Sequence, residues 1–514
     1  MTAAPVPATQ PPGGSTAPTW EGLVAAALVG TARRPPPRST LLADLSDPAA
    51  ALLGEAAVLG AYRRAGRLPG QAPRTLPPPA DPDERPACSA AAVEVLELIL
   101  SGEVPIPGGV ALLAGQWLDA AARAGRRVPA RLLPRLLDLG SGSPALQPAL
   151  RSVVGPRGRW LAGHHHRWAW ATGQPFDDLE AVEQRFATAA KAERPGLLEA
   201  MRSAEPAHGL ELLRSTWKRD PAAERAALLA ALAVGLSDDD EPFLESALDD
   251  RSAAVRQVAI ELLGRLPASR RAARMAERLG ALVGPDDALY VAYPGEPDAA
   301  ARRDGLNDAA PAGMSASAWR LAQLVAATPL SFWTEHLGLS ATEVVASAAA
   351  DTTTAGKRGA APAGPLLLGL ESAVVTQAQK ADPSWAVAVF GYRRSPAVLA
   401  ALPPALAADL LSRLVGAGLG PGPAVAELFA ACPGPWPPSL GEAILDRYRQ
   451  LGSRAVLELQ AALPVLAARL DPATLPLVET WAVTLADNQS LRRRVQTLGH
   501  ALSLRAVIQR EFPS

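Results

Sequence analysis

The sequence predicts an all-α protein, a solenoid of stacked helix pairs with additional helical regions toward its N- and C-terminal ends. Of its 514 residues, 48% are hydrophobic but only 4% are aromatic, so Ala, Leu and Val must fill the core. Ala and Leu are strong helix formers, whereas the residues that favour strands are sparse. Apolar residues also recur at helical spacing along most of the chain, and two segments between residues 205 and 267 repeat one another.

The first 18 residues are rich in Pro, Gly and Thr and are expected to form a disordered tail. Structure is predicted to begin with a helix from Thr19 to about Val29. Thr19 suits the N-cap of this helix, and Gly30 suits its end. A second helix is predicted near Pro48–Arg64.

These helices open an N-terminal helical region that we assign to residues 19–170. It contains a proline-rich connector at 69–87, whose seven prolines exclude a regular helix. Three further helices are predicted here, at Ser89–Ser101, Gly108–Ala124 and Pro129–Leu139. The region closes after the segment GPRGRWLAGHHHRWAW.

The internal repeat places a helical-repeat region at residues 171–283. A shift of 31 positions superposes Arg225 on Arg256 and Leu232 on Leu263. Asp220 and the Asp250–Ser252 cluster are expected to mark helix starts, because short acceptor side chains satisfy exposed N–H groups. A pair of short helices cannot bury both of its apolar faces alone, so such units are expected to stack.

Residues 284–315 form a predicted connector, in which Leu289–Tyr293 is the one candidate strand. A C-terminal helical region follows at 316–514, interrupted by a flexible loop at 351–365. The predicted helices are Ala316–Ala327, Pro329–Leu337, Ala341–Ala350, Leu366–Gln379, Ser384–Phe390, Pro396–Leu402, Ala405–Val415, Ala424–Ala431, Leu440–Leu451, Ser453–Ala468, Thr474–Ala486 and Ser490–Ile508. The last of them carries one apolar stripe and is expected to cap the end of the stack.

Charge and cysteine content exclude several classes of protein. The formal net charge is −1, but residues 1–170 carry about +5 and the remainder about −6. The two cysteines, Cys88 and Cys432, exclude a disulfide framework and a cysteine-rich metal site. The N-terminus lacks the features of a signal peptide, and no run of ~18 apolar residues occurs. A cytoplasmic location without membrane contact is the resulting expectation.

Two motifs resemble ligand-binding sites, but neither has the residues or the geometry that such a site needs. His164, His165 and His166 are adjacent, so their imidazoles would point in different directions on a helix or strand and could not readily share one metal ion. The segment TTTAGKRG, around Lys357, lacks the first Gly and the Ser or Thr of a phosphate-binding loop. The sequence therefore predicts no cofactor, no metal site and no catalytic residues.

Arginine clusters remain as candidate interaction surfaces. Arg33 and Arg34 follow the first helix; a helix C-terminus repels phosphate, so they are expected to pair with acidic groups or helix carbonyls, with ligand contact as the alternative. Nucleic-acid binding would need arginine clusters to converge beside aromatic side chains; the alternative is solvated helix faces. The candidate surface residues are Arg33, Arg34, Arg126, Arg127, Trp168 and Arg256. Core packing is expected for Trp20, Trp217, Trp319, Trp333, Trp385 and Trp481.

Several segments together resemble an uncharacterised bacterial family of helical proteins. They are ALVGTARRP (27–35), EAAVLGAYRRAGRLP (55–69), GPRGRWLA (155–162) and VRQVAIELLGRLP (255–267). The resemblance extends from about Trp20 to Phe512. It implies genomic neighbours of three kinds: a SWIM zinc-finger protein, a MoxR-type AAA ATPase and a von Willebrand factor A-domain protein. Separately, the unit at 205–267 is similar to HEAT repeats.

These observations favour a non-enzymatic protein-interaction scaffold or adaptor. The resemblance suggests that such a scaffold serves a MoxR-type ATPase and von Willebrand factor A-domain system, so either protein is an expected partner. Two alternatives stay open: a HEAT-like protein that binds nucleic acid through arginine-rich faces, and an enzyme of unrecognised type.

Overall fold

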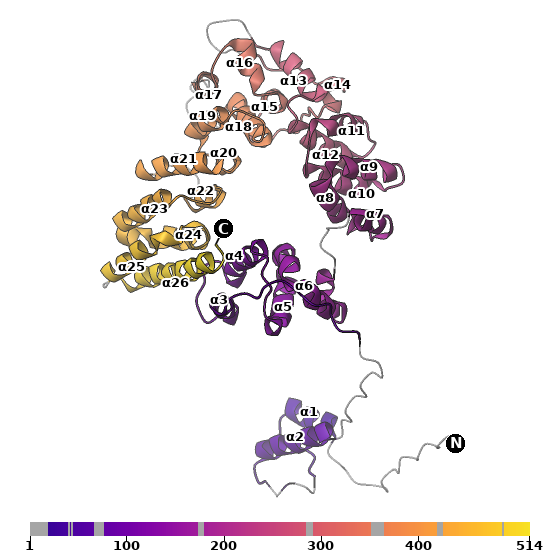
Figure 1. Ribbon diagram of the computed structural model, residues 1–514, viewed down its shortest axis with the longest axis vertical. Helices are drawn as coiled ribbons and strands as arrows, with labels where there is room; N and C mark the ends of the chain where they lie inside the picture. Colours follow the sequence, from indigo (N-terminus) through magenta and orange to yellow (C-terminus); the bar gives the residue numbers. More distant parts are fainter. Residues whose placement is uncertain are drawn as a thin grey trace. The chain divides into compact units, whose positions relative to one another are not determined.

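The computed structural model consists of two compact units, Met1–Pro79 and Ala80–Ser514 (Figure 1). It describes residues 19–39, 42, 45–65, 77–172, 179–283, 291–350, 364–418, 425–485 and 488–513. Regular structure in these residues is helical, with two isolated β-bridges and no strand. The all-α prediction is confirmed. The expected disordered tail and the Lys357 segment lie outside the described residues.

The first unit contains two helices that pack on each other, α1 (Trp20–Val29) and α2 (Pro48–Ala65). The Thr19 hydroxyl accepts a hydrogen bond from the N–H of Gly22 at 3.1 Å, as the cap prediction requires. Gly30 ends α1 with φ 94°, a backbone conformation that suits glycine. Both predicted helices are therefore confirmed.

The second unit begins with a group of helices that follow the proline-rich connector. They are α3 (Ala90–Ser101), α4 (Val110–Arg123), η1 (Ala130–Leu132), α5 (Leu133–Gly142), η2 (Pro144–Leu146), α6 (Gln147–Gly163) and η3 (His166–Ala171). The end of the connector is fixed in place: Arg85 pairs with Asp83 and donates to the carbonyl of Ser152 at 2.7 Å. A kink at Gly155, with φ 63°, lets α6 pass against these two side chains.

Shorter helices follow in the middle of the unit. They are α7 (Leu179–Thr188), α8 (Arg194–Ala204), α9 (Pro206–Thr216), α10 (Ala222–Ala230), η4 (Ala231–Ala233), η5 (Asp238–Asp240), α11 (Glu241–Ala247), α12 (Ala253–Gly264), α13 (Arg270–Gly280) and α14 (Ala299–Arg303). Helices α8, α10 and α12 pack against one another in succession, and α11 packs on α12. The sequence patterns did not predict two of these helices: α13, and α14, which lies inside the predicted connector at 284–315. The candidate strand is only partly described: Val291 forms a single bridge with Val283.

The remaining helices occupy the C-terminal part. They are α15 (Ala316–Ala327), α16 (Ser331–Leu337), α17 (Ala341–Ala350), α18 (Pro365–Gln377), α19 (Pro383–Arg393), α20 (Pro396–Ala401), α21 (Pro404–Gly416), α22 (Val425–Ala431), α23 (Pro438–Leu451), η7 (Gly452–Arg454), α24 (Ala455–Arg469), η8 (Pro472–Thr474), α25 (Leu475–Thr484) and α26 (Gln489–Glu511). All twelve predicted helices of this region are found, with ends that differ by up to three residues.

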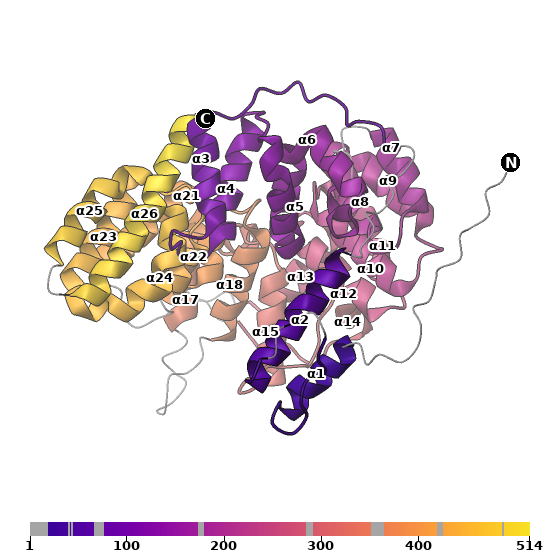
Figure 2. The same ribbon diagram turned by 90° about the horizontal axis from the view of Figure 1, so that it is seen from below.

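Helix α26 does not end the unit as a free cap. Its predicted stripe is buried, and its neighbours include α24 and α25 as expected. However, α26 also packs on α3 and α4, which lie nearly 400 residues earlier (Figures 1 and 2). Phe512 contacts Trp117 of α4 edge to face, with ring centroids 5.3 Å apart. The prediction of a terminal cap is therefore wrong, because apolar side chains cover α26 on this side as well.

Two apolar cores occupy the second unit. One contains buried residues of α7 to α12, and the other joins α3–α6 to α13–α26. The stretch Pro438–Arg469 has the length and mean hydropathy, 1.2, of a membrane span. It comprises two helices separated at Gly452, and α24 packs on α22, α23 and α26. These contacts favour a role as core helices.

Candidate functional site

Four of the six candidate surface residues are exposed arginines that follow the C-terminal ends of α1 and α4, and the structure does not bring the six together. Arg33, Arg34, Arg126 and Arg127 are exposed. None of these four side chains forms an ion pair with a described residue, so the expected pairing of Arg33 and Arg34 is not found. No described hydrogen bond, ion pair or ring contact joins any two of the six side chains.

Trp168 and Arg256 instead have intramolecular roles. Trp168 donates from Nε1 to Asp138 at 2.9 Å and stacks on His165, with ring centroids 4.3 Å apart. Arg256 donates from Nη1 to the carbonyl oxygen of Asp250 at 2.7 Å. Of the three adjacent histidines, His164 and His166 are exposed, and no group of metal-ligating side chains occurs among the described residues.

The predicted tryptophan core is found in part. Trp333, Trp385 and Trp481 are buried, whereas Trp20 is 40% exposed and lies beneath the guanidinium of Arg63. Trp20 is exposed because α1 meets only α2 within the first unit. The core prediction is therefore wrong for this residue.

A ladder of buried arginine–carboxylate pairs links successive helices of the central region. Arg194 of α8 donates to both carboxylate oxygens of Asp220, at 2.8 and 3.2 Å, and also contacts Glu224. Arg225 of α10 repeats this contact with Asp250, at 2.8 and 3.2 Å. Such bidentate contacts fix the orientation of the guanidinium and the carboxylate as well as their separation, so they set the register between neighbouring helix pairs.

Helices α10 and α12 begin directly after the predicted start signals, and Ser252 is the N-cap residue of α12, but no side chain makes the expected capping hydrogen bond. The carboxylate of Asp220 binds Arg194 and caps no helix, while its main-chain carbonyl accepts from Arg225 at 2.9 Å. Burial is the largest single influence on Asp220 and raises its pKa, but the hydrogen bonds from Arg194 and Thr216 and the charge of Arg194 together hold the pKa below its usual value. The two carboxylates of the ladder follow their arginines by 26 and 25 residues, a spacing that could have revealed them in the sequence.

A third buried pair lies inside the α8–α11 region. Arg202 and Asp240 are each 1% exposed and are joined by two hydrogen bonds, of 2.9 and 2.7 Å. The same guanidinium also donates to the main-chain carbonyls of Pro206, Leu232, Val234 and Gly235. Nothing in the local sequence pattern distinguishes this arginine from exposed ones.

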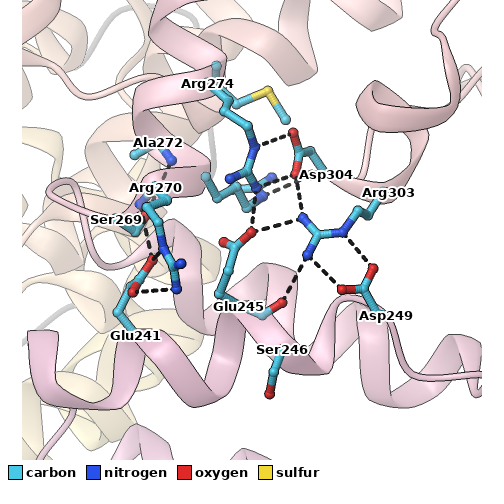
Figure 3. Close-up of polar contacts among 12 residues, drawn as sticks. Glu241, Glu245, Ser246, Asp249, Ser269, Arg270, Ala272, Arg274, Arg303 and Asp304 are labelled. Carbon is cyan, nitrogen blue, oxygen red and sulfur yellow. Dashed lines mark hydrogen bonds and ion pairs between the residues drawn. The ribbon is translucent and has the colours of Figure 1, made fainter.

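A larger network joins α11, α13 and α14 (Figure 3). Asp304 is 1% exposed and accepts from Arg274, Arg278 and Arg303. Glu245 of α11 accepts from Arg274 at 2.8 Å and from Arg303 at 2.9 Å. Burial alone would raise the pKa of Asp304, but the hydrogen bonds from Arg274 and Arg278 hold it below its usual value.

The arginines of α13 from Arg270 to Arg278 form one of the arginine clusters, and neither nucleic-acid binding nor a solvated helix face describes them fully. Arg270 is exposed, but it pairs with Glu241 at 2.9 Å, and Arg271 is buried with its Nε on the carbonyl of Asp304. Burial lowers the pKa of Arg271 to about 10, so it stays charged at neutral pH. Glu241 and Asp304 have pKa values below the usual range, which suits permanent ion pairing and not proton transfer near pH 7. The network connects helices and is a poor candidate for catalysis.

Comparison with known families decides where the chain belongs. The model of a family of unknown function, DUF5691, matches residues 22–512. The chain belongs to this family. No curated protein is similar to it. A crystal structure of an engineered protein matches with 13% identity over 81% of this chain and 99% of that one, at a TM-score of 0.22. A similarity this weak assigns neither fold nor function to the DUF5691 chain.

Proposed function

We propose that the chain is a non-enzymatic protein-interaction scaffold built in part from HEAT-like helix pairs. The succession α8, α10 and α12 and the ladder of arginine–carboxylate pairs at nearly equal spacing support the repeat architecture. Every rung of the ladder ties one helix pair to the next. A stack of this kind holds distant surfaces in fixed positions, which is the property a scaffold needs.

The exposed apolar surface of the first unit carries the proposal. Leu28 is 83% exposed, Leu53 71% and Tyr62 63%, and Val29 adds a further half-exposed side chain. Two helices offer each other little area to bury, and Leu23, Ala26 and Ala51 are their buried apolar residues. Adjacent exposed apolar side chains can mark a protein-binding site, and Leu28 and Val29 are adjacent in this way. A partner that covers it would also stabilise the helix pair.

Co-purification with defined proteins tests this function. The full-length chain is mixed with a purified MoxR-type ATPase or von Willebrand factor A-domain protein, the partners that the family resemblance implies. We expect one of them to bind, and Leu28→Glu to weaken binding by about tenfold or more, which corresponds to ~1.4 kcal/mol. Leu457→Glu on α24 is the matched control, because Leu457 is 81% exposed. If neither protein binds and in-cell cross-linking recovers no protein partner, the scaffold function is wrong.

Nucleic-acid binding is the alternative that the arginines suggest. It has less support, because Arg274, Arg278 and Arg303 are bound to carboxylates and are not available to phosphate. Arg126 and Arg127 are exposed, and their joint change to glutamate tests this alternative in gel-shift assays. A salt-dependent shift that this double variant weakens would favour nucleic acid over a protein partner.

A further inference from the structure

A cleft of about 1010 Å³ opens where α4 meets α26, within the second unit. Gln116, Asp119 and Arg123 line it from α4. Arg505 and Gln509 line it from α26, and Phe512 lies just beyond that helix. The walls thus come from two helices that are adjacent in space and far apart in sequence (Figure 2).

Arg505 is a half-buried cation whose hydrogen-bond partners are all neutral. Its Nε donates to Gln116 Oε1 at 2.9 Å, and its Nη1 donates to the carbonyl oxygens of Ala467 and Leu470. Nη2 donates to no group among the described residues, and no described carboxylate forms an ion pair with Arg505. Burial lowers its pKa to about 10, partly offset by the charge of Asp471, so the guanidinium remains protonated at neutral pH.

A charge that is partly withdrawn from water and has no counter-charge carries a desolvation cost, and an incoming anion would reduce that cost. The cleft offers a second cation in Arg123, which is exposed and forms no ion pair with a described residue. Asp119 is the one acidic side chain in the lining, so the lining carries a net charge of one positive unit. This balance suits a single carboxylate better than a polyphosphate backbone, which Asp119 would repel.

The remaining lining suits a peptide. Ile508 and Phe512 are buried apolar side chains at the wall of the cleft, and Pro435 adds an exposed apolar ring. The volume exceeds that of a single amino acid, so several residues of an extended chain can enter. A peptide with an acidic residue beside an apolar one could therefore place its carboxylate near the arginines and its apolar side chain against the apolar lining.

We propose that this cleft binds an extended acidic segment of a partner protein. A carboxylate of the segment accepts hydrogen bonds from Arg505 Nη2 and from Arg123, and a neighbouring apolar side chain packs on Phe512. The inference rests on the proposed scaffold function and names one of the surfaces that the scaffold uses. It concerns the second unit alone and is independent of the Leu28 surface.

Selection from random peptides tests the proposal without a known partner. Dodecapeptides displayed on phage are selected against the immobilised full-length chain, and the enriched sequences are synthesised with a fluorescent label. We expect them to contain Asp or Glu beside an apolar residue. Their Kd, measured by fluorescence anisotropy, should rise by about tenfold in Arg123→Glu, the effect of losing one favourable charge contact of ~1.4 kcal/mol.

Two further variants separate the cleft from the general surface charge. Arg126→Glu makes the same change of charge at an exposed arginine outside the cleft, and it should leave the Kd within about twofold. Asp119→Asn removes the one acidic group of the lining and should tighten binding. Both residues are exposed, so neither variant threatens the fold as Arg505→Gln would.

The proposal is overturned if the selected peptides carry no excess of acidic residues. It is equally overturned if Arg126→Glu weakens binding as much as Arg123→Glu, or if a twenty-residue oligothymidylate displaces the peptides at lower concentration than the unlabelled peptides do. These results would not contradict the proposed scaffold function if a partner protein still co-purifies with the chain and Leu28→Glu still weakens that binding. Conversely, acidic peptides that depend on Arg123 would support the cleft even if neither candidate partner protein bound.

Discussion

Replacing Asp240 with Asn should weaken the α8–α11 region far more than an ordinary surface change. The carboxylate lies 2.7 and 2.9 Å from the guanidinium of Arg202, and both side chains are 1% exposed. Asn preserves the size of the side chain but removes its charge. Arg202 would then keep its bonds to main-chain carbonyls, such as that of Val234, while its charge stayed buried without a counter-charge.

The magnitude follows from this environment. Breaking a buried ion pair by removing one partner costs about 3–5 kcal/mol, and the remaining carbonyl contacts place this variant at about 3 kcal/mol. Asp238 provides the control within the same turn of helix. It is 62% exposed and pairs with Lys380, so Asp238→Asn should cost only ~0–1 kcal/mol.

Hydrogen exchange measures this cost locally, which matters because a chain with several cores need not unfold in one step. In peptides that cover α8 to α11, exchange of protected amides should accelerate by about 100-fold in Asp240→Asn and by less than about fivefold in Asp238→Asn. The double variant Arg202→Met, Asp240→Leu should regain much of the protection, since no charge is left buried. Equal exchange in the two Asn variants would refute the reasoning.

Three further predictions concern packing, reactivity and pH. An added Cβ at Gly369 would lie 2.6 Å from Val325 Cβ, so Gly369→Ala should cost about 1–3 kcal/mol and lower the Tm, whereas Gly391→Ala, which meets nothing within 4 Å, should be neutral or slightly stabilising. Burial raises the pKa of Cys432 to about 11, so iodoacetamide at pH 8 should label it only after unfolding; rapid labelling of the folded chain would contradict this. The pKa of Asp304 is depressed, so its contribution to stability should persist down to about pH 4 and disappear as the pH falls through the folded-state pKa; a circular-dichroism titration in which loss of helix begins near pH 6 would argue against it.

Helices with a clear apolar stripe could be predicted from the sequence because the stripe records which face is buried. Val255, Ala259 and Leu263 of α12 and Leu491 and Val495 of α26 are all buried as their spacing requires. Helix α13 escaped prediction, since its sequence RRAARMAERLG hides its buried positions among arginines. The packing of α26 on α3 could not be predicted either, because periodicity reveals that a face is buried and not which distant helix covers it.

The candidate site residues show that the sequence could not predict which arginines are buried. Arg33 and Arg126 look the same in sequence as Arg194 and Arg202, yet the first two are exposed and the last two are buried in ion pairs. Composition reports how many arginines exist, and the burial of each depends on contacts up to tens of residues away. The spacing of the ladder would have separated Arg194 from the exposed arginines, but Arg202 lies 38 residues before Asp240 and does not share that spacing.

Because many arginines are already paired with carboxylates, few of the described arginines are available to bind an anionic ligand. An arginine that already binds two carboxylate oxygens gains little from a further anion, because its charge is compensated and its donors are occupied. Arg194, Arg225 and Arg274 are of this kind. Arg505 is different, since it is half-buried yet donates only to neutral acceptors. A cation in that state interacts more strongly with an incoming carboxylate than an exposed arginine does, because little water screens the contact. We therefore expect a carboxylate to bind the cleft between α4 and α26 in preference to the ion-paired arginines of the ladder.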